Sequence, residues 1–522
     1  MTDELTPAPG PAPTPTALRS SLLVLGACAL FMVCLHALAI TGYGYFRDEL
    51  YYIASTRHLD AGYVDHPPFS IILLAAWCGL FGDSVVAVRS LSILAGAALV
   101  VVTGLSVRAM GGRLYAQALA SAAVAVTPVL RGTQHFYSMN SLDQLFWGLA
   151  GLVLIFLVTT GSRRLWLLLG FVLGLGLLNK LSVLWLGVGI GLGLLLTPHR
   201  HLLATRWPWI GAGVAAVVIL PHLVWQAVWG FPTVEFVRNA TALKMVSHGA
   251  AEFLANQLLL MNVTALPLFL AGLAGGIFMP QLRRWAILPI IFLAVLATLL
   301  VSGSSKGYYL AAAYPFAIIP GAVALEVILA RGWWRRAGWL YALVIVLAGL
   351  AVAPLAIPLL PQEDFIAYWR KLGVAPAEEE RSRSGELPQH FADMHGWQEM
   401  AANVANAYAS LSAEEKEKCV VYGQNYGHAA AIDVLGRKHG LPRAISGHNS
   451  YWLWGPGQWT GEVIIVIGGD QHEMARVFRS VVQAGTTDAP YAMPYERNLP
   501  IYVCRGLTVP LSDLWPRLRV FI

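Results

Sequence analysis

The 522-residue sequence contains few charged residues. Aspartate, glutamate, lysine and arginine make up 12% of the chain, whereas hydrophobic residues make up 57%. This balance excludes an ordinary soluble protein, because a water-exposed surface of that size needs many more polar side chains. The sequence therefore predicts a polytopic membrane protein.

Several familiar motifs are also missing. The sequence has no Cys-x-x-Cys pair, no His-Glu-x-x-His and no Walker-type glycine loop. An ATP-driven pump or a soluble enzyme that uses nucleotide sugars is therefore disfavoured. The net charge of +6 does not indicate nucleic acid, because the arginines lie in short turns between apolar segments and not in one basic stripe. We expect any activated donor to arrive through the membrane.

About eleven apolar segments approach the roughly 20 residues that a helix needs to cross a bilayer. They occupy residues 21–40, 86–107, 114–131, 142–160, 165–179, 182–197, 208–229, 255–279, 285–302, 308–329 and 338–360. The organisation predicted from this pattern is a disordered cytoplasmic tail over 1–18, a transmembrane domain over 19–360 and an extracytoplasmic α/β domain over 361–522.

Residues 67–81 are apolar, but they are fewer than a typical span and could either cross the membrane or lie in its interface. If they lie flat, the arginine-rich turns between the later spans all fall on one side, as the positive-inside rule requires. We therefore expect an interfacial helix here, with the N-terminus in the cytoplasm and the C-terminal domain outside.

The C-terminal domain has short apolar runs at 419–422, 463–468 and 501–504, which are typical of strands. Helical patterns at 396–410 and 471–483 alternate with them, and this favours a small layered sheet. Cys419 and Cys504 both lie in this domain, where a disulfide is chemically permitted.

An acidic pair, Asp48 and Glu49, follows the first apolar segment, and a second cluster contains Asp65 and His66 before two prolines. Ionisable groups at a membrane boundary are costly to desolvate and often functional. From the residues alone, this loop could supply a general base, a metal ligand or an ion gate. Ordinary solvation in the interface is the alternative.

Asp143 begins another span, and Arg131 or His135 could be its partner in a purely structural ion pair. Lys180 and Lys306 lie at outward boundaries, where each could bind a phosphate or merely extend its ammonium group into the interface. Arg89 and Arg238 carry the same two interpretations.

The order of these motifs resembles the GT-C membrane glycosyltransferases, in the branch of the protein mannosyltransferases and lipid A aminoarabinose transferases, or bacterial glycosyltransferase family 39. The resemblance covers residues 20–330. It is carried by Asp48-Glu49, Asp65-His66-Pro67-Pro68, Arg89, Asp143, Asn179-Lys180-Leu181-Ser182 and Lys306 with Tyr308-Tyr309.

The resemblance implies a GT-C fold and transfer of a sugar from a polyprenyl-phosphate donor, with inversion. The acceptor would be a lipid, polysaccharide or protein outside the bacterial cytoplasmic (inner) membrane, in the cell envelope. Asp48 would be the general base, Glu49 would orient it, and Asp143 would position Asp48 or the acceptor. The donor phosphate would be held by the following side chains: His66, Arg89, Lys180, Lys306, Tyr308 and Tyr309.

Further donor or acceptor contacts are expected from another group: Asp65, Arg131, His135, Glu235 and Arg238. The sequence requires no cofactor, although Mg²⁺ or Mn²⁺ could bind Asp48, Glu49 and Asp143 through carboxylate oxygens. His66 stands where the lipid A branch usually has lysine, so phosphate binding there would depend on pH.

The alternative function is a secondary transporter with an outward-facing carboxylate site. Transporters tend to place ionisable groups near the middle of the membrane and often contain inverted repeats. Here the acids cluster at one membrane face and no repeat is visible, which favours the enzyme.

Overall fold

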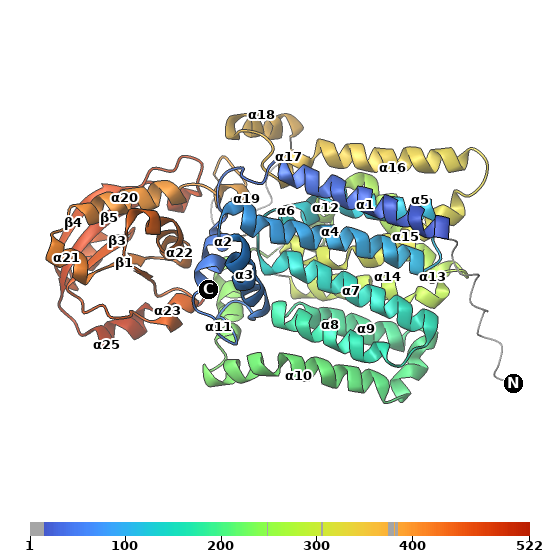
Figure 1. Ribbon diagram of the computed structural model, residues 1–522, viewed down its shortest axis with the longest axis horizontal. Coiled ribbons are helices and arrows are strands. Elements are labelled where there is room, and N and C mark those ends of the chain that lie inside the picture. The colour runs from blue at the N-terminus through green and yellow to red at the C-terminus, as the bar shows by residue number, and fades with distance from the viewer. Residues whose placement is uncertain (1–14, 248, 304–305, 374–379, 382–384) are drawn as a thin grey trace.

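The computed structural model describes residues 15–247, 249–303, 306–373, 380–381 and 385–522, and it has two parts (Figure 1). One part is a bundle of helices and the other is a sheet covered by helices. Residues 1–14 of the predicted tail lie outside the described residues, whereas residues 15–18 already belong to the first helix, α1 (Pro15–Ala37).

Six helical segments in the described part of the chain are long and apolar enough to cross a membrane. They are α1, α4 (Val85–Ala109), α7 (Met139–Thr160), α10 (Trp207–Val228), η4 (Arg283–Trp285) with α14 (Ile287–Ser302), and α16 (Trp334–Ala351). Four bent pairs also qualify: α5 (Leu114–Val126) with α6 (Pro128–His135), α9 (Val183–Leu195) with η1 (Pro198–Ala204), α12 (Ala250–Leu260) with η3 (Val263–Ala265) and α13 (Leu266–Phe278), and η5 (Gly307–Ala313) with α15 (Pro315–Ile328).

Together with the shorter α8 (Leu165–Asn179), these elements overlap every one of the predicted apolar segments. The prediction of a polytopic helical membrane protein is therefore confirmed. The bends were not predicted. The bend of 57° between α5 and α6 has a local cause, because Thr127 precedes Pro128 and takes extended dihedral angles that end the first helix. The bend of 96° between α12 and the segment that ends with α13 contains Asn262, which has a positive φ of 72°.

Two short helices, α2 (Arg47–Ser55) and α3 (Phe69–Phe81), lie at the end of the bundle that faces the sheet (Figure 1). The first helix, α1, begins at the opposite end (Figure 1). α3 contacts α2, α4 and α8. Its position agrees with the expected interfacial helix, while the side of the membrane that it faces remains a prediction.

The C-terminal sheet has the strand order β2-β1-β3-β5-β4. Its strands are β1 (Cys419–Gly423), β2 (Ala444–Ile445), β3 (Val463–Ile467), β4 (Phe478–Thr486) and β5 (Pro500–Leu507). β1 pairs in parallel with β2 and β3, whereas β5 is antiparallel to both β3 and β4. The helices α20 (Trp397–Ala409) and α22 (Tyr426–Leu435) share one apolar core with β1 and β3. The predicted α/β domain is thus confirmed.

One prediction for this domain is wrong. Residues 471–483 were expected to form one helix, but α24 covers only Gln471–Met474 and strand β4 follows it. The β-branched pair Val481 and Val482 favours a strand, and β5 supplies the pairing partner. The permitted disulfide is absent, because Cys419 and Cys504 are both unpaired and belong to separate apolar cores.

The remaining elements are short. They are α11 (Pro232–Asn239), η2 (Ala240–Lys244), α17 (Ala353–Ala356), α18 (Gln362–Leu372), α19 (Gln389–Ala392), α21 (Ala413–Lys418), η6 (Gly436–His439), α23 (Ser450–Trp454), η7 (Pro494–Glu496), α25 (Leu511–Leu514) and η8 (Trp515–Leu518). The predicted domain boundary at residue 361 falls between α17 and α18.

Candidate functional site

Glu49 lies in the first turn of α2 and is completely buried. Its Oε2 accepts a hydrogen bond of 2.8 Å from the backbone N–H of Phe46, the residue that caps the helix. Its Oε1 accepts another of 2.9 Å from the backbone N–H of Tyr137. The carboxylate also faces the guanidinium of Arg89, with 3.1 Å between Arg89 Nε and Glu49 Oε1. Glu49 therefore joins α2 to α4 and to the segment that precedes α7.

Arg89, on α4, is also completely buried. Besides Glu49, its guanidinium donates to the backbone carbonyls of Ile40, at 2.8 Å, and Gly44, at 2.5 Å. These bonds fix the chain between α1 and α2 against α4. The side chain was predicted to bind the donor phosphate, but this geometry favours a positioning role for what we call the buried pair, Glu49 and Arg89.

Asp48 precedes Glu49 by one residue and has a different environment. Its side chain is 35% exposed. Its Oδ1 accepts a hydrogen bond of 2.8 Å from the hydroxyl of Tyr426, the first residue of α22 in the C-terminal domain. Arg47 Nε lies 3.7 Å from the same oxygen. Asp48 is thus the carboxylate of the acidic pair that a substrate can reach.

Arg47 connects Asp48 to the segment before α20. Its Nη2 lies 3.3 Å from Asp393 Oδ2, and its backbone N–H donates to the Asp393 carbonyl at 2.9 Å. Burial raises the pKa of Asp393 to about 6, although the charge of Arg47 opposes the shift. Gln389 then bridges two carboxylates, because its Nε2 donates to Asp393 Oδ2 at 3.4 Å and to Glu380 Oε2 at 2.9 Å.

Two lysines from separate elements meet at Glu380. Lys306 Nζ lies 2.6 Å from Glu380 Oε1, and Lys244 Nζ lies 3.5 Å from the same oxygen. Burial favours the neutral carboxyl, but the two ammonium groups outweigh it and lower the pKa of Glu380 to about 2. Burial lowers the pKa of Lys244, and the nearby charges of Glu380 and Asp48 oppose that shift. We call Asp48, Arg47, Glu380, Lys244 and Lys306 the exposed network, after Asp48 and the partly exposed lysines, whereas Arg47 and Glu380 within it are buried.

Asp143 pairs with Lys180 and not with Arg131 or His135, which the sequence offered as possible partners in a structural ion pair. Lys180 Nζ lies 3.8 Å from Asp143 Oδ2. The hydroxyl of Ser182 donates to that oxygen at 2.9 Å, and the indole N–H of Trp147 donates to Asp143 Oδ1 at 3.0 Å. This set of donors satisfies a carboxylate that is only 3% exposed. The partner comes from the Asn-Lys-Leu-Ser segment that carried the family resemblance.

The predicted phosphate ligands Tyr308 and Tyr309 lie beside Lys180. The Lys180 ammonium is 5.7 Å from the ring centre of Tyr308 and 5.2 Å from that of Tyr309. The backbone N–H of Tyr309 donates to the carbonyl of Lys306 at 3.1 Å. The segment that begins with Lys306 and continues into η5 therefore brings Tyr308 and Tyr309 against Lys180.

His66 is surrounded by tyrosine rings. Its ring centre lies 4.7 Å from that of Tyr52 and 4.8 Å from that of Tyr63, and its side chain is buried. Asp65 accepts a hydrogen bond of 3.0 Å from the hydroxyl of Tyr51, and burial raises its pKa. This aromatic enclosure favours a structural role for His66.

The other predicted contacts are not brought together. Arg131 is buried in the bundle and donates to the Gly349 carbonyl at 2.6 Å, while His135 lies 3.4 Å from Arg89 Nη1. Glu235 pairs with Arg519 at 3.3 Å, and Arg238 is exposed on α11. Only His135 lies next to the buried pair.

The predicted carboxylates do not form a cation site as they stand. Within the described residues, no three His, Cys, Asp or Glu side chains are grouped closely enough to hold a metal ion. Glu49 is occupied by Arg89, and Asp143 by Lys180 and Ser182. The three acids therefore do not fit the Mg²⁺ or Mn²⁺ site that was considered from the sequence.

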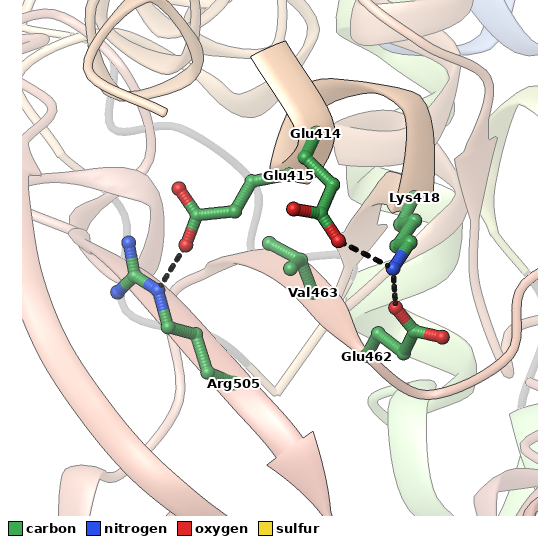
Figure 2. Close-up of a pocket in the computed structure, with 6 residues that line it drawn as sticks. All are labelled: Glu414, Glu415, Lys418, Glu462, Val463 and Arg505. Carbon is green, nitrogen blue, oxygen red and sulfur yellow. Dashed lines mark hydrogen bonds and ion pairs between the residues drawn. The ribbon is translucent and has the colours of Figure 1, made fainter. Parts of the chain in front are cut away.

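Figure 2 shows a hollow on the outside of the C-terminal domain. Its charged side chains pair with one another: Lys418 lies 3.0 Å from Glu414 and 2.8 Å from Glu462, and Arg505 lies 2.6 Å from Glu415. The hollow is lined by Glu414, Glu415, Lys418, Glu462, Val463 and Arg505. None of these residues belongs to the exposed network, so the hollow is a separate surface feature.

Five residues of the site were missed from the sequence: Arg47, Lys244, Glu380, Asp393 and Tyr426. All but Arg47 follow the first seven apolar segments and reach the site through tertiary contacts. Lys244 carried a weak signal, since it is a cation in an outward loop. Tyr426 lies in a glycine- and aromatic-rich turn that could contact a sugar or simply pack tightly, whereas nothing local distinguishes Glu380 and Asp393 from neighbouring polar residues.

Comparisons with known proteins match part of the sequence to a protein family and to a curated relative. The family model described as dolichyl-phosphate-mannose-protein mannosyltransferase matches residues 65–225. The lipid A galacturonosyltransferase RgtD of Rhizobium johnstonii is 29% identical over 210 residues, which cover 40% of this chain and 43% of that protein. The chain thus aligns with less than half of the relative's length.

Similarity to solved structures extends over nearly the whole chain. The crystal structure of ArnT from Cupriavidus metallidurans in the apo state matches with a TM-score of 0.61 at 14% identity, covering 93% of this chain and 98% of that one. ArnT bound to undecaprenyl phosphate gives 0.59 at 14% identity, with coverages of 92% and 97%. The two proteins share a fold that includes the C-terminal sheet.

Proposed function

We propose that this chain, a multi-pass membrane protein of the GT-C superfamily, is a glycosyltransferase that uses a polyprenyl-phosphate-linked sugar. The observation that carries the proposal is the exposed network, in which the reachable Asp48 is linked through Arg47, Asp393 and Gln389 to Glu380 and its two lysines. A base and a group of cations are what transfer from a lipid phosphate requires.

Asp48 is the general base in this proposal. As the acceptor oxygen attacks the anomeric carbon, its proton passes to Asp48. The bond between that carbon and the phosphate oxygen breaks, and the polyprenyl phosphate leaves with the electron pair. One direct displacement inverts the configuration of the sugar.

Lys306 and Lys244 stabilise the leaving phosphate. Both ammonium groups now face the carboxylate of Glu380, so the site already holds one anionic group. A phosphate offers more negative charge and more acceptor oxygens than a carboxylate. The donor would therefore displace Glu380, while Lys180 and Asp143 position the donor or the acceptor nearby.

The acceptor is expected to lie outside the cytoplasm, on the side of the membrane that carries the sheet. The relative RgtD is named as a lipid A galacturonosyltransferase, and ArnT was crystallised with undecaprenyl phosphate. Lipid A and undecaprenyl-phosphate sugars are therefore the first acceptor and donor to test, with the bacterial inner membrane as the expected location.

The fold does not favour the alternative of a secondary transporter. Asp48 and Asp143 each hydrogen-bond to fixed partners at one end of the bundle, and Asp143 is paired with Lys180. A coupling-ion path near mid-membrane would need carboxylates elsewhere.

The test is a transfer assay with the full chain in liposomes that contain undecaprenyl-phosphate-linked sugars and lipid A. Asp48→Asn should lower the transfer rate by about 10²- to 10⁴-fold, because the amide cannot accept the proton. Glu363→Gln, an exposed acid on α18, is the matched control and should retain the rate. Unchanged transfer by Asp48→Asn would overturn the assignment of the base.

A further inference from the structure

We infer that Tyr426 is a positioning residue for Asp48, so that the C-terminal domain forms part of the catalytic site. This inference rests on the proposed function, because it gives Asp48 the role of the base. It also assigns a task to a domain that shares its fold with ArnT and whose role the sequence left open.

The contact is made by the functional groups themselves. The Tyr426 hydroxyl donates to Asp48 Oδ1 at 2.8 Å, across 378 positions of the sequence. Within the described residues, no hydrogen bond to Asp48 Oδ2 is found. One carboxylate oxygen is therefore held, and the other is available to accept the proton of an acceptor hydroxyl.

Tyr426 is itself held on two sides. Its ring centre lies 4.8 Å from that of Tyr51 and 5.5 Å from the guanidinium carbon of Arg47, and the residue is 7% exposed. Tyr51 and Arg47 both belong to α2, the helix that carries Asp48. The Tyr426 phenol and the Asp48 carboxylate are thus held in a fixed position relative to each other.

The start of α22 is anchored inside the sheet domain. Asn425 caps the helix, because its Oδ1 accepts from the backbone N–H of His428 at 3.0 Å. The Asn425 amide donates to Glu496 Oε1 at 3.0 Å, and Glu496 also pairs with the His428 ring. These bonds hold the first turn of α22, which carries Tyr426, in place.

Other contacts hold the two parts of the chain together at this place. The backbone N–H of Val64 donates to the Ser450 hydroxyl at 3.1 Å, and the backbone N–H of Ser450 donates to the Tyr51 hydroxyl at 3.3 Å. Pre-organised partners of this kind lower the cost of reaching the reactive geometry. The domain therefore orients the base and does more than cover the bundle.

The test compares Tyr426→Phe with Tyr451→Phe in the full chain, with rates taken per monodisperse molecule. Tyr451 is a buried tyrosine of the same domain whose hydroxyl donates to Asp433 Oδ2 at 2.7 Å. Tyr426→Phe should lower kcat about tenfold and leave the donor KM within about twofold. Tyr451→Phe should keep kcat within about twofold.

A double variant separates positioning from general packing. Adding Tyr426→Phe to Asp48→Asn should cause no further loss of rate, because the hydroxyl acts through the carboxylate. A normal kcat for Tyr426→Phe would overturn the inference, and so would equal losses in Tyr426→Phe and Tyr451→Phe. A normal rate for Asp48→Asn would instead refute the proposed function, so the two failures are distinguishable.

Discussion

Asp48 and Glu49 are neighbours in the first turn of α2, but their carboxylates face two different regions of the molecule. Glu49 and Arg89 are completely buried and bonded to backbone groups, whereas Asp48 is 35% exposed and belongs to a network with partly exposed lysines. A buried pair cannot bind a ligand unless it first gives up its own partners, which leaves a charge unpaired. Exposure therefore separates the group that maintains the site from the group that can act on a substrate.

Removal of Arg89 should have the largest effect of the changes that test this comparison between the buried pair and the exposed Asp48. Arg89→Met leaves Glu49 buried without a counter-charge, and we expect a loss of about 3 to 5 kcal/mol in stability. Thermal unfolding of the purified protein in detergent measures this change. Arg163→Met, at an exposed arginine in a turn, should unfold like the original chain.

The opposite outcome for Arg89→Met would restore its predicted role. If the variant unfolds normally but needs much more donor for half-maximal transfer, Arg89 contacts the phosphate and the comparison fails.

Lys306→Ala tests the exposed network, with a smaller expected effect. The donor KM should rise about tenfold, because one charge-assisted contact to the phosphate is lost. The melting temperature should fall less than in Arg89→Met, because Lys244 and Gln389 still face the carboxylate of Glu380. Lys371→Ala, at the exposed end of α18, is the control. An unchanged donor KM would remove Lys306 from the phosphate site.

Glu380→Gln is expected to have the smallest effect and the opposite sign. The amide carries no charge, so it competes less with the phosphate, and the donor KM should fall about threefold. Because the pKa of Glu380 is lowered to about 2, its carboxylate stays charged at every working pH. The ratio of the donor KM of Glu380→Gln to that of the original chain should thus be constant between about pH 5 and 8.

Glu386→Gln, an exposed residue a few positions later, is the control for this measurement. A higher donor KM in Glu380→Gln would mean that the carboxylate holds the lysines in place for the phosphate and does not compete with it.

The lowered pKa of Glu380 also makes the stability of the protein depend on pH. The lysine partners lower the folded pKa of Glu380 below its ordinary value, so its contribution is present at neutral pH. That contribution is lost as the pH falls from the unfolded pKa, about 4.5, towards 2. Asp393 behaves in the opposite way: burial raises its pKa to about 6, so it contributes at low pH and less as the pH rises through that value.

Much of the fold was predictable because the bilayer restricts which secondary structures can cross it. Apolar length alone located the helical segments, and the resemblance agrees with the family match over residues 65–225 and with the fold shared with ArnT. The bend at Asn262 was not predictable, because it depends on a single residue with positive φ. Strand β4 was missed because its pairing with β5 is not local.

The site was predictable only where its residues are near apolar boundaries. Asp48, Asp143, Lys180 and Lys306 stood out as charges beside membrane segments. Their partners could not be assigned, because Tyr426 and Glu380 come from distant parts of the chain. Only the family resemblance assigned the base to Asp48 and not to Glu49, since which of two adjacent acids is buried depends on packing against α4 and the C-terminal domain.

The most direct test measures transfer and thermal unfolding on the same preparations of Asp48→Asn and Arg89→Met. We expect Asp48→Asn to keep its melting temperature and lose transfer, and Arg89→Met to lose melting temperature while its folded molecules still transfer sugar. A folded Arg89→Met that is inactive, together with an active Asp48→Asn, would contradict the account.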